Sequence, residues 1–128
     1  MRLVSKAAVA LVVAGAALTG VPAAQASAAA MPGCSAKPGP NLDNGYGILK
    51  GSYNLKGTYY RDSCNVARMR KGTKLYFHCW KRNRHGNLWV YGRIAGTRTY
   101  GWTSGANFRS VRGANYFRCD SNKDRDHT

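Results

Sequence analysis

The sequence predicts a small all-β domain of about five short antiparallel strands with irregular, disulfide-tied ends. Three observations predict it. From Tyr46 onward, aromatic and β-branched residues occur in short runs separated by glycine-containing turns. No later segment shows a sustained helical period. Four cysteines, Cys34, Cys64, Cys79 and Cys119, can staple a domain of this size. Short strands at this spacing indicate a small barrel or sandwich.

The first 26 residues have the order of a secretory signal peptide. Arg2 and Lys6 give a positive start, residues 7–18 are small and apolar, and Ala24-Gln25-Ala26 fits a cleavage site. A membrane anchor is the weaker alternative, because the apolar stretch is shorter than the roughly 20 residues that span a bilayer. We therefore expect a secreted, extracellular protein with no membrane span in its mature form.

The cleavage point affects the length and charge of the mature chain. Two later alanine triplets, ending at Ala28 and Ala30, also fit the cleavage pattern. The chain has 128 residues and a formal net charge of +15, from 20 Lys and Arg against 5 acids. Loss of Arg2 and Lys6 with the signal peptide lowers that charge to +13. A chain of this size can hold one modest core, and export permits disulfides.

Composition divides the chain into four regions. They are a signal peptide (1–26), an irregular Pro-, Gly- and Asn-rich segment (27–44), a barrel domain (45–110) and a polar C-terminal tail (111–128). The expected strands are residues 47–55, 65–69, 74–80, 88–94 and 98–103.

The cysteine spacing predicts a disulfide pairing. Positions 64 and 79 are symmetric about Lys71-Gly72, where the pattern calls for a turn. A two-residue hairpin loop there would place Cys64 opposite Cys79, close enough for a bridge. We therefore predict the pair Cys64–Cys79 and, by elimination, Cys34–Cys119. Four cysteines allow three connectivities, so the other pairings stay open.

Three short motifs stand in order along the predicted strands. They are Lys71-Gly72-Thr73, Gly86-Asn87-Leu88-Trp89 and Gly101-Trp102. This succession, over about residues 47–109, resembles the bacterial SH3-like (Src-homology-3-like) domain. That family typically has Lys-Gly-Thr before a strand, Gly-x-x-Trp at the start of the next, and Gly-Trp-Val before a short final segment. In this chain Thr103 stands in place of the valine.

The resemblance implies a small SH3-like barrel whose function is binding. Family members are often appended to cell-wall hydrolases, which they hold on peptidoglycan through its peptide bridges, and others bind peptides or metals. The resemblance places Tyr59 and Tyr60 in a long first loop beside the groove, with Tyr91 and Tyr100 near the same groove. We expect no appended enzyme, because too little chain remains for a catalytic domain.

The acidic residues argue against a hydrolase. All five are aspartates, and there is no glutamate. A glycosidase needs two carboxylates flanking the bond, whereas Asp43 and Asp62, the only acids ahead of the tail, are expected to be solvated loop residues. His78, His85 and His127 could serve a ribonuclease, but no glutamate is present to pair with them. We expect a protein that is not an enzyme.

We expect neither a metal nor another cofactor. Cysteines oxidised after export cannot act as thiolate ligands. Asp120, Asp124 and Asp126 loosely resemble a calcium loop, but the spacing lacks the central glycine and the closing glutamate. A polar tail explains these residues better.

Aromatic side chains provide a candidate ligand surface. Along residues 74–80, strand alternation places Phe77 and Cys79 inward and Tyr76 and Trp80 outward. The candidate ligand-binding residues are Tyr59, Tyr60, Tyr76, Trp80, Tyr91 and Tyr100. The alternative is a structural role, since small barrels use aromatic residues on both faces to cover their ends.

Basic side chains gather around two predicted turns, with no acids interspersed. The candidate polyanion-binding residues are Arg68, Arg70, Lys71, Lys74, Lys81, Arg82 and Arg84. A surface of this charge attracts polyanions with a steep salt dependence. An ordinary solvated surface is the alternative.

These observations favour a secreted, non-catalytic, monomeric module that associates with the bacterial cell envelope. Its expected partners are peptidoglycan or an anionic wall polymer, with nucleic acid bound without sequence preference. Three alternatives stay open: an inhibitor or partner of a secreted enzyme, an extracellular ligand of a sensor, and a small secreted ribonuclease or antimicrobial toxin. Size, export and charge do not separate them.

Overall fold

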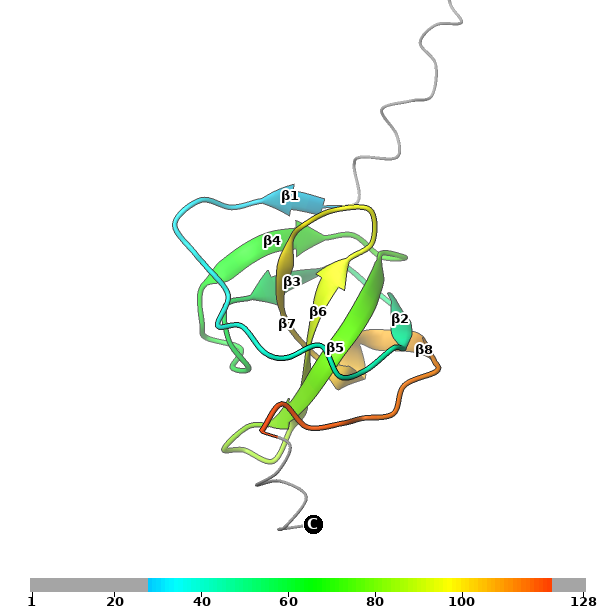
Figure 1. The fold of residues 1–128 in the computed structure, drawn as a ribbon. Helices are drawn as coiled ribbons and strands as arrows, with labels where there is room; N and C mark the ends of the chain where they lie inside the picture. Colours follow the sequence, from blue (N-terminus) through cyan, green and yellow to red (C-terminus); the bar gives the residue numbers. More distant parts are fainter. Residues whose placement is uncertain (1–27, 121–128) are drawn as a thin grey trace, which may run out of the picture.

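The computed structural model describes residues 28–120, which form one antiparallel sheet of eight strands and a short 3₁₀ helix (Figure 1). The elements are β1 (Ala28–Ala30), β2 (Tyr46–Leu49), β3 (Tyr53–Lys56), β4 (Asn65–Met69), β5 (Lys74–Arg82), β6 (Leu88–Ile94), β7 (Tyr100–Ser104), η3 (Gly105–Asn107) and β8 (Phe108–Arg112). The strand order is β1-β4-β3-β7-β6-β5-β2-β8, so β1 and β8 are the two edges. The predicted signal peptide (1–26) and the end of the predicted tail (121–128) lie outside the described residues.

The all-β prediction is confirmed, but the sheet is larger than expected. Residues 65–69 and 88–94 are strands as predicted, whereas the range 47–55 is divided into β2 and β3 by a bend. Two further strands, β1 and β8, lie at the edges. Because β1 consists only of alanines, which have little strand preference of their own, its pairing with the edge of β4 defines it.

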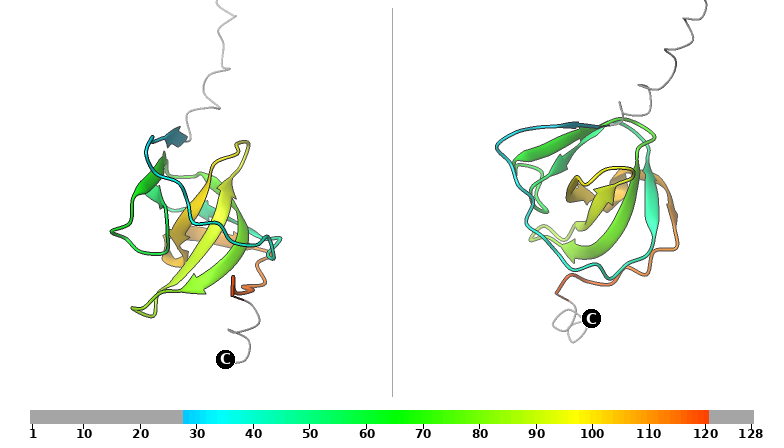
Figure 2. Two further views of the ribbon diagram at one scale, coloured as in Figure 1. Left: turned by 60° about the vertical axis from the view of Figure 1, so that its left-hand side comes forward. Right: turned by 45° about the horizontal axis from the view of Figure 1, so that its top comes forward.

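The sheet curves around one main core, to which both of its halves contribute (Figure 2). The fully buried residues are Leu49, Leu55, Ala67, Met69, Leu75, Phe77, Trp80, Val90 and Ile94. They come from β2 to β6, so strands far apart in the sheet order pack against the same interior. No helix of residues 28–120 is long and apolar enough to cross a membrane.

A bulge in β5 overturns the predicted outward position of Trp80. The register between β5 and β6 shifts between Phe77 and Cys79, which reverses the inside–outside alternation beyond that point. Phe77 and Trp80 therefore both face the main core, with their rings edge-to-face at 4.9 Å, and Trp80 is only 1% exposed. Cys79 turns to the opposite face. Trp80 is therefore a core residue and not part of an exposed aromatic face.

The disulfide prediction is wrong: the bridges are Cys34–Cys64 and Cys79–Cys119. The turn at Lys71-Gly72 does not join a hairpin, because β4 pairs with β1 and β3 while β5 pairs with β2 and β6. The chain therefore crosses to another part of the sheet at this turn, and the cysteines on either side of it are not opposite each other. Two disulfides indicate an oxidising, extracellular environment.

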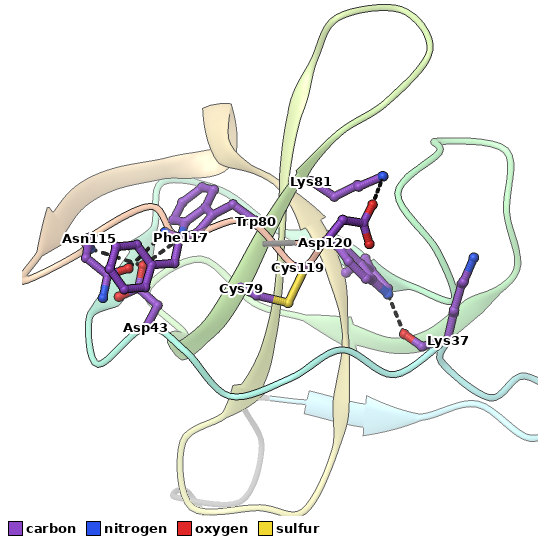
Figure 3. Close-up of a disulfide and its surroundings, with 10 residues drawn as sticks. Lys37, Asp43, Cys79, Trp80, Lys81, Asn115, Phe117, Cys119 and Asp120 are labelled. Atoms are coloured by element: carbon purple, nitrogen blue, oxygen red, sulfur yellow. Dashed lines mark hydrogen bonds and ion pairs between the residues drawn. A yellow bond between two sulfur atoms is a disulfide. The ribbon is translucent and has the colours of Figure 1, made fainter. Parts of the chain in front are cut away.

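Asp43 is buried, although the sequence predicts a solvated loop residue. It is 1% exposed, and one carboxylate oxygen accepts hydrogen bonds from Trp80 Nε1 (2.7 Å) and Asn115 N (3.1 Å) (Figure 3). The same oxygen accepts from Tyr116 N (3.0 Å). The other oxygen accepts from Gly45 N (2.8 Å). A buried carboxylate is tolerated when it is saturated with donors in this way. Asp43 thereby fastens the chain before β2 to the chain after β8.

Candidate functional site

The segment of residues 36–43, called the strap here, crosses the outer face of the sheet. At one end, Lys37 N donates to Gly57 O (2.8 Å) after β3, and at the other, Leu42 N donates to His78 O (2.7 Å) in β5. The ribbon views show this segment running across β6 and β5 (Figures 1 and 2). The strap therefore lies across the strands rather than along them.

The strap covers three neighbouring side chains on the outer face that would otherwise be exposed. Cys79, Tyr91 and Trp102 are in register on neighbouring strands β5, β6 and β7. Trp102 Nε1 donates to Lys37 O (2.8 Å), and a Cβ on Gly39 would lie 2.7 Å from Cys79 Sγ. The backbone of the strap thus packs directly on these three side chains, and the close approach requires a glycine at position 39.

Tyr91 therefore does not fit its predicted ligand-binding role. It is 7% exposed, and Gly39 sits beside its ring, so that a Cβ added to Gly39 would lie 3.5 Å from Tyr91 Cδ2. Burial and the neighbouring Tyr100 raise the pKa of the Tyr91 hydroxyl above its ordinary value. Tyr91 is of a residue type that suits ligand binding, but a segment distant in sequence covers it.

The strap divides the outer face into two open parts. Along β6, the residues Trp89, Tyr91 and Arg93 share this face because they alternate with the core residues Val90 and Ile94. Tyr91 lies under the strap, so Trp89 falls on one side of it and Arg93 on the other. We call the part around Trp89 the groove side and the part around Arg93 the row side.

On the groove side, two loops enclose a hollow of about 1050 Å³. Its walls come from the β3–β4 loop and the β5–β6 turn, whereas Trp89 and Ser104 come from the sheet. The lining residues are Thr58, Tyr60, Arg61, Asp62, Ser63, Asn83, Arg84, His85, Asn87, Trp89 and Ser104. This hollow, called the groove here, is large enough for a ligand of several units.

Asn83 joins the two walls of the groove. Its side chain is largely buried, and its Nδ2 donates to Tyr59 O (3.0 Å) across the gap between the loops. Its Oδ1 accepts from His85 N (3.0 Å) and Asn87 N (3.1 Å), which shapes the turn. Both loops are thus held in place before a ligand arrives.

Tyr60 makes the second link between the walls. Its hydroxyl accepts a hydrogen bond from Arg84 N (3.0 Å), while its ring lies edge-on to the imidazole of His85 at 6.0 Å. The guanidinium of Arg84 lies 5.5 Å from the Tyr60 ring centroid. On its own loop, Tyr60 O accepts from Ser63 Oγ (2.7 Å). An aromatic ring and a cation are therefore held together at the rim of the groove.

The charges of the groove favour an anionic ligand. Arg61 and Arg84 are exposed on opposite walls, and His85 is exposed beside Arg84. The single acid in the lining is Asp62, which is also exposed. Two guanidinium groups facing one hollow can bind carboxylate or phosphate oxygens in a bidentate manner.

The predicted aromatic surface is not continuous. Tyr60 lines the groove, and Tyr59 packs edge-on against Trp102 at 5.0 Å beside the strap. Tyr76 and Tyr100 lie on the row side, in register with Arg93 and away from the groove. The structure thus pairs Tyr59 with Tyr60 (5.3 Å between ring centroids) and Tyr91 with Tyr100 (6.1 Å), but it does not join the six predicted residues into one surface.

The predicted polyanion-binding residues form two groups at opposite ends of β5. Arg68, Arg70, Lys71 and Lys74 lie at its start, and Lys81, Arg82 and Arg84 lie at its end. The eight steps from Lys74 to Arg82 correspond to about 26 Å, at about 3.3 Å per residue. Only the second group adjoins the groove, and within it Lys81 is paired with Asp120.

The described acids do not form a catalytic pair. Asp43 is buried and saturated with donors, Asp62 lines the groove, and Asp120 is bound to Lys81. Partial burial and then the charge of Arg93 lower the pKa of His78 below its ordinary value, so its imidazole is neutral at neutral pH. Among residues 28–120, no group of three or more His, Cys, Asp or Glu side chains could hold a metal ion.

Sequence reasoning missed the strap, Asn83, Arg61 and Arg93. The Pro-Gly-Pro run at residues 38–40 indicates an extended chain, which is the conformation of a strap, but nothing in it indicates where the chain lies. Asn83 stands in a turn, where asparagine ordinarily bonds to its own backbone.

Comparison of the chain with protein-family models, curated proteins and solved structures finds no match in any of the three.

Proposed function

We propose that this chain is a secreted, non-catalytic module that binds an anionic component of the bacterial cell envelope in the groove. The observation that carries the proposal is the pair of arginines, Arg61 and Arg84, on opposite walls of a preformed hollow. Peptidoglycan peptides carry carboxylates, and anionic wall polymers carry phosphates or carboxylates. Both chemistries suit guanidinium groups.

In this proposal, net charge and the groove contribute to binding at different distances. The exported chain carries +13, which attracts a polyanionic wall from a distance and in a salt-dependent manner. The groove then provides short-range contacts: Arg61 and Arg84 to oxygens, and the ring of Tyr60 to an apolar part of the ligand. Net charge supports the encounter, whereas the groove supports selectivity.

The resemblance to SH3-like domains supports the same proposal. We propose that the curved antiparallel sheet is an enlarged version of that barrel, with β1 and β8 added at the edges. In this interpretation the β3–β4 loop is the long first loop that the resemblance places beside the binding groove. Tyr60 lies on that loop and lines the groove, in keeping with its predicted role.

A retention assay on purified peptidoglycan, with and without its anionic polymers, tests the proposal. The variant Arg61→Gln/Arg84→Gln should lose retention, whereas Arg70→Gln/Arg109→Gln should keep most of it. Both variants lose two positive charges, and Arg70 and Arg109 are exposed outside the groove. If the wild-type protein is retained on neither material at low salt, the proposal is wrong. Equal losses by the two variants would reduce it to diffuse charge attraction.

A further inference from the structure

The row side of the outer face carries a line of two arginines and three tyrosines. Direct cross-strand partners run from Arg112 in β8 to Tyr46 in β2, Tyr76 in β5, Arg93 in β6 and Tyr100 in β7. Directly opposed residues in antiparallel strands point to the same face. These five side chains, called the cation–tyrosine row here, therefore form one line across five strands, over about 19 Å at about 4.8 Å per strand.

Tyrosine rings hold two cations of this region in place. Lys74, two residues before Tyr76 on the same face, has its Nζ 4.2 Å from the Tyr46 centroid and 5.2 Å from the Tyr76 centroid. The Arg93 guanidinium lies 5.1 Å from the Tyr76 centroid. Its Nη1 also donates to Thr97 O (3.0 Å). Side chains positioned in this way lose less conformational entropy when an anion binds.

The row remains accessible and lacks acids. Arg112 is exposed, Tyr100 is 37% exposed, and Tyr46, Tyr76 and Arg93 are partly exposed. Each acid of the described chain is elsewhere: Asp43 is buried, Asp62 lines the groove, and Asp120 pairs with Lys81. No acid among residues 28–120 therefore offsets the cations of the row, and their positive charge suits a chain with repeated negative charges.

We propose that the cation–tyrosine row is a second binding surface, for a linear phosphodiester polymer laid across the strands. Arg93, Arg112 and Lys74 contact successive phosphates, and the tyrosine hydroxyls and rings contact the units between them. A narrow line of charge suits a flexible single chain, which can follow the curvature of the sheet. Because the strap separates the row from the groove, this surface does not depend on the proposed function of the groove.

The test measures binding of two labelled probes by fluorescence anisotropy across a range of salt concentrations. One probe is an oligothymidylate, and the other is a poly(glycerol phosphate) chain without bases. Removal of one cation that binds a phosphate should reduce the steepness of the salt dependence by about 0.7. Arg93→Gln/Arg112→Gln should therefore lower the slope by about 1.4 and weaken binding roughly tenfold.

Matched variants separate the row from general charge. The pair Arg70→Gln/Arg109→Gln, exposed and outside both the row and the groove, removes the same charge and should leave phosphodiester affinity within about twofold. Because Arg93 also supports its turn through Thr97 O, Arg93→Lys serves as a second variant that keeps the charge and should retain most of the binding. A thermal unfolding curve for each variant establishes that it is folded.

The outcomes are distinct. Binding of both probes, weakened only by the row variant, supports recognition of the phosphodiester chain itself. Binding of the oligothymidylate alone, with the same variant pattern, supports the surface and identifies single-stranded nucleic acid as its source. Equal weakening by the row pair and by the Arg70/Arg109 pair overturns the proposal. A labelled polyglutamate of similar length, which carries carboxylates, is a third probe, and equal affinity for it also overturns the proposal. Retention on peptidoglycan by the row variant shows that the groove functions separately.

Discussion

The groove and the cation–tyrosine row lie on one face of one sheet, yet they are built in different ways. The groove is formed by loops, and hydrogen bonds through Asn83 and Tyr60 hold its walls together. The row is formed by strands, and its spacing follows from the register of the sheet. The first is a hollow between two loops, whereas the second is an open line of side chains across the curved sheet. Similar residue types therefore give two surfaces, because the strap covers what lies between them.

The largest expected effect comes from releasing the strap at Asp43. Asp43→Ala leaves Trp80 Nε1, Asn115 N and Tyr116 N without their acceptor, so the free energy of unfolding should fall by about 3–5 kcal/mol. Urea unfolding measures this loss. Asp62→Ala, which removes an exposed acid, is the control and should change stability by less than about 0.5 kcal/mol. A loss below about 1 kcal/mol for Asp43→Ala would show that this anchor is unimportant.

A substitution in the middle of the strap should loosen its packing on the sheet. Gly39→Ala places a Cβ 2.7 Å from Cys79 Sγ, so the strap must move and stability should fall by about 1–3 kcal/mol. Trp102, which donates to Lys37 O, should become more accessible, and acrylamide quenching of tryptophan fluorescence measures this change. The control is Ser35→Ala, an exposed change just before the strap. Unchanged quenching in Gly39→Ala would contradict the close packing of the strap.

The sequence is sufficient to predict the strand class and insufficient to predict how the outer face is divided. The predicted inside–outside alternation along residues 74–77 is correct, because the pairing of β5 with β6 is regular up to Phe77. At the bulge after Phe77 the alternation reverses, and no local signal marks it, so regular alternation places Trp80 on the wrong face. The cysteine symmetry likewise assumes that strands adjacent in sequence pair in space, which fails between β4 and β5.

For the candidate site, the residue types are predictable from the sequence, but their grouping in space is not. Composition indicates aromatic and basic ligand contacts, and Tyr60 and Arg84 do lie in the groove. The strap is not predictable, because its position depends on long-range bonds such as Lys37 N to Gly57 O. Once the strap is in place, Tyr91 is covered and Tyr76 is separated from Tyr60. The number of surfaces is thus a tertiary property.

A smaller effect, confined to the groove side, is expected from Asn83→Ala. It removes the bond to Tyr59 O and the two bonds that shape the turn, so the groove walls should loosen at a cost of about 1–2 kcal/mol. Retention on peptidoglycan should weaken, while phosphodiester binding should be unchanged. The exposed Asn44→Ala, outside the groove, is the control. If both activities fall together, the two surfaces are not independent.

The smallest effect is a pH dependence on the row side. The pKa of His78 is lowered in the folded protein by burial and Arg93, with the rings of Tyr91 and Tyr100 against it. The unfolded chain, with a His pKa near 6.5, therefore binds the proton first as the pH falls. Stability should be unaffected above that value and decrease below it. His78→Gln should lose less stability between about pH 7.5 and about pH 5 in thermal unfolding curves, and identical losses would show that His78 does not contribute.

The central claim, that the strap leaves two independent binding surfaces, is tested most directly by amide chemical shifts in ¹⁵N-labelled protein. A soluble peptidoglycan fragment should shift the amides of Tyr60, Arg61, Arg84 and His85 and leave those of Tyr76, Arg93 and Tyr100 in place. The poly(glycerol phosphate) probe should give the opposite pattern. If both ligands shift the same set of amides, the account is contradicted.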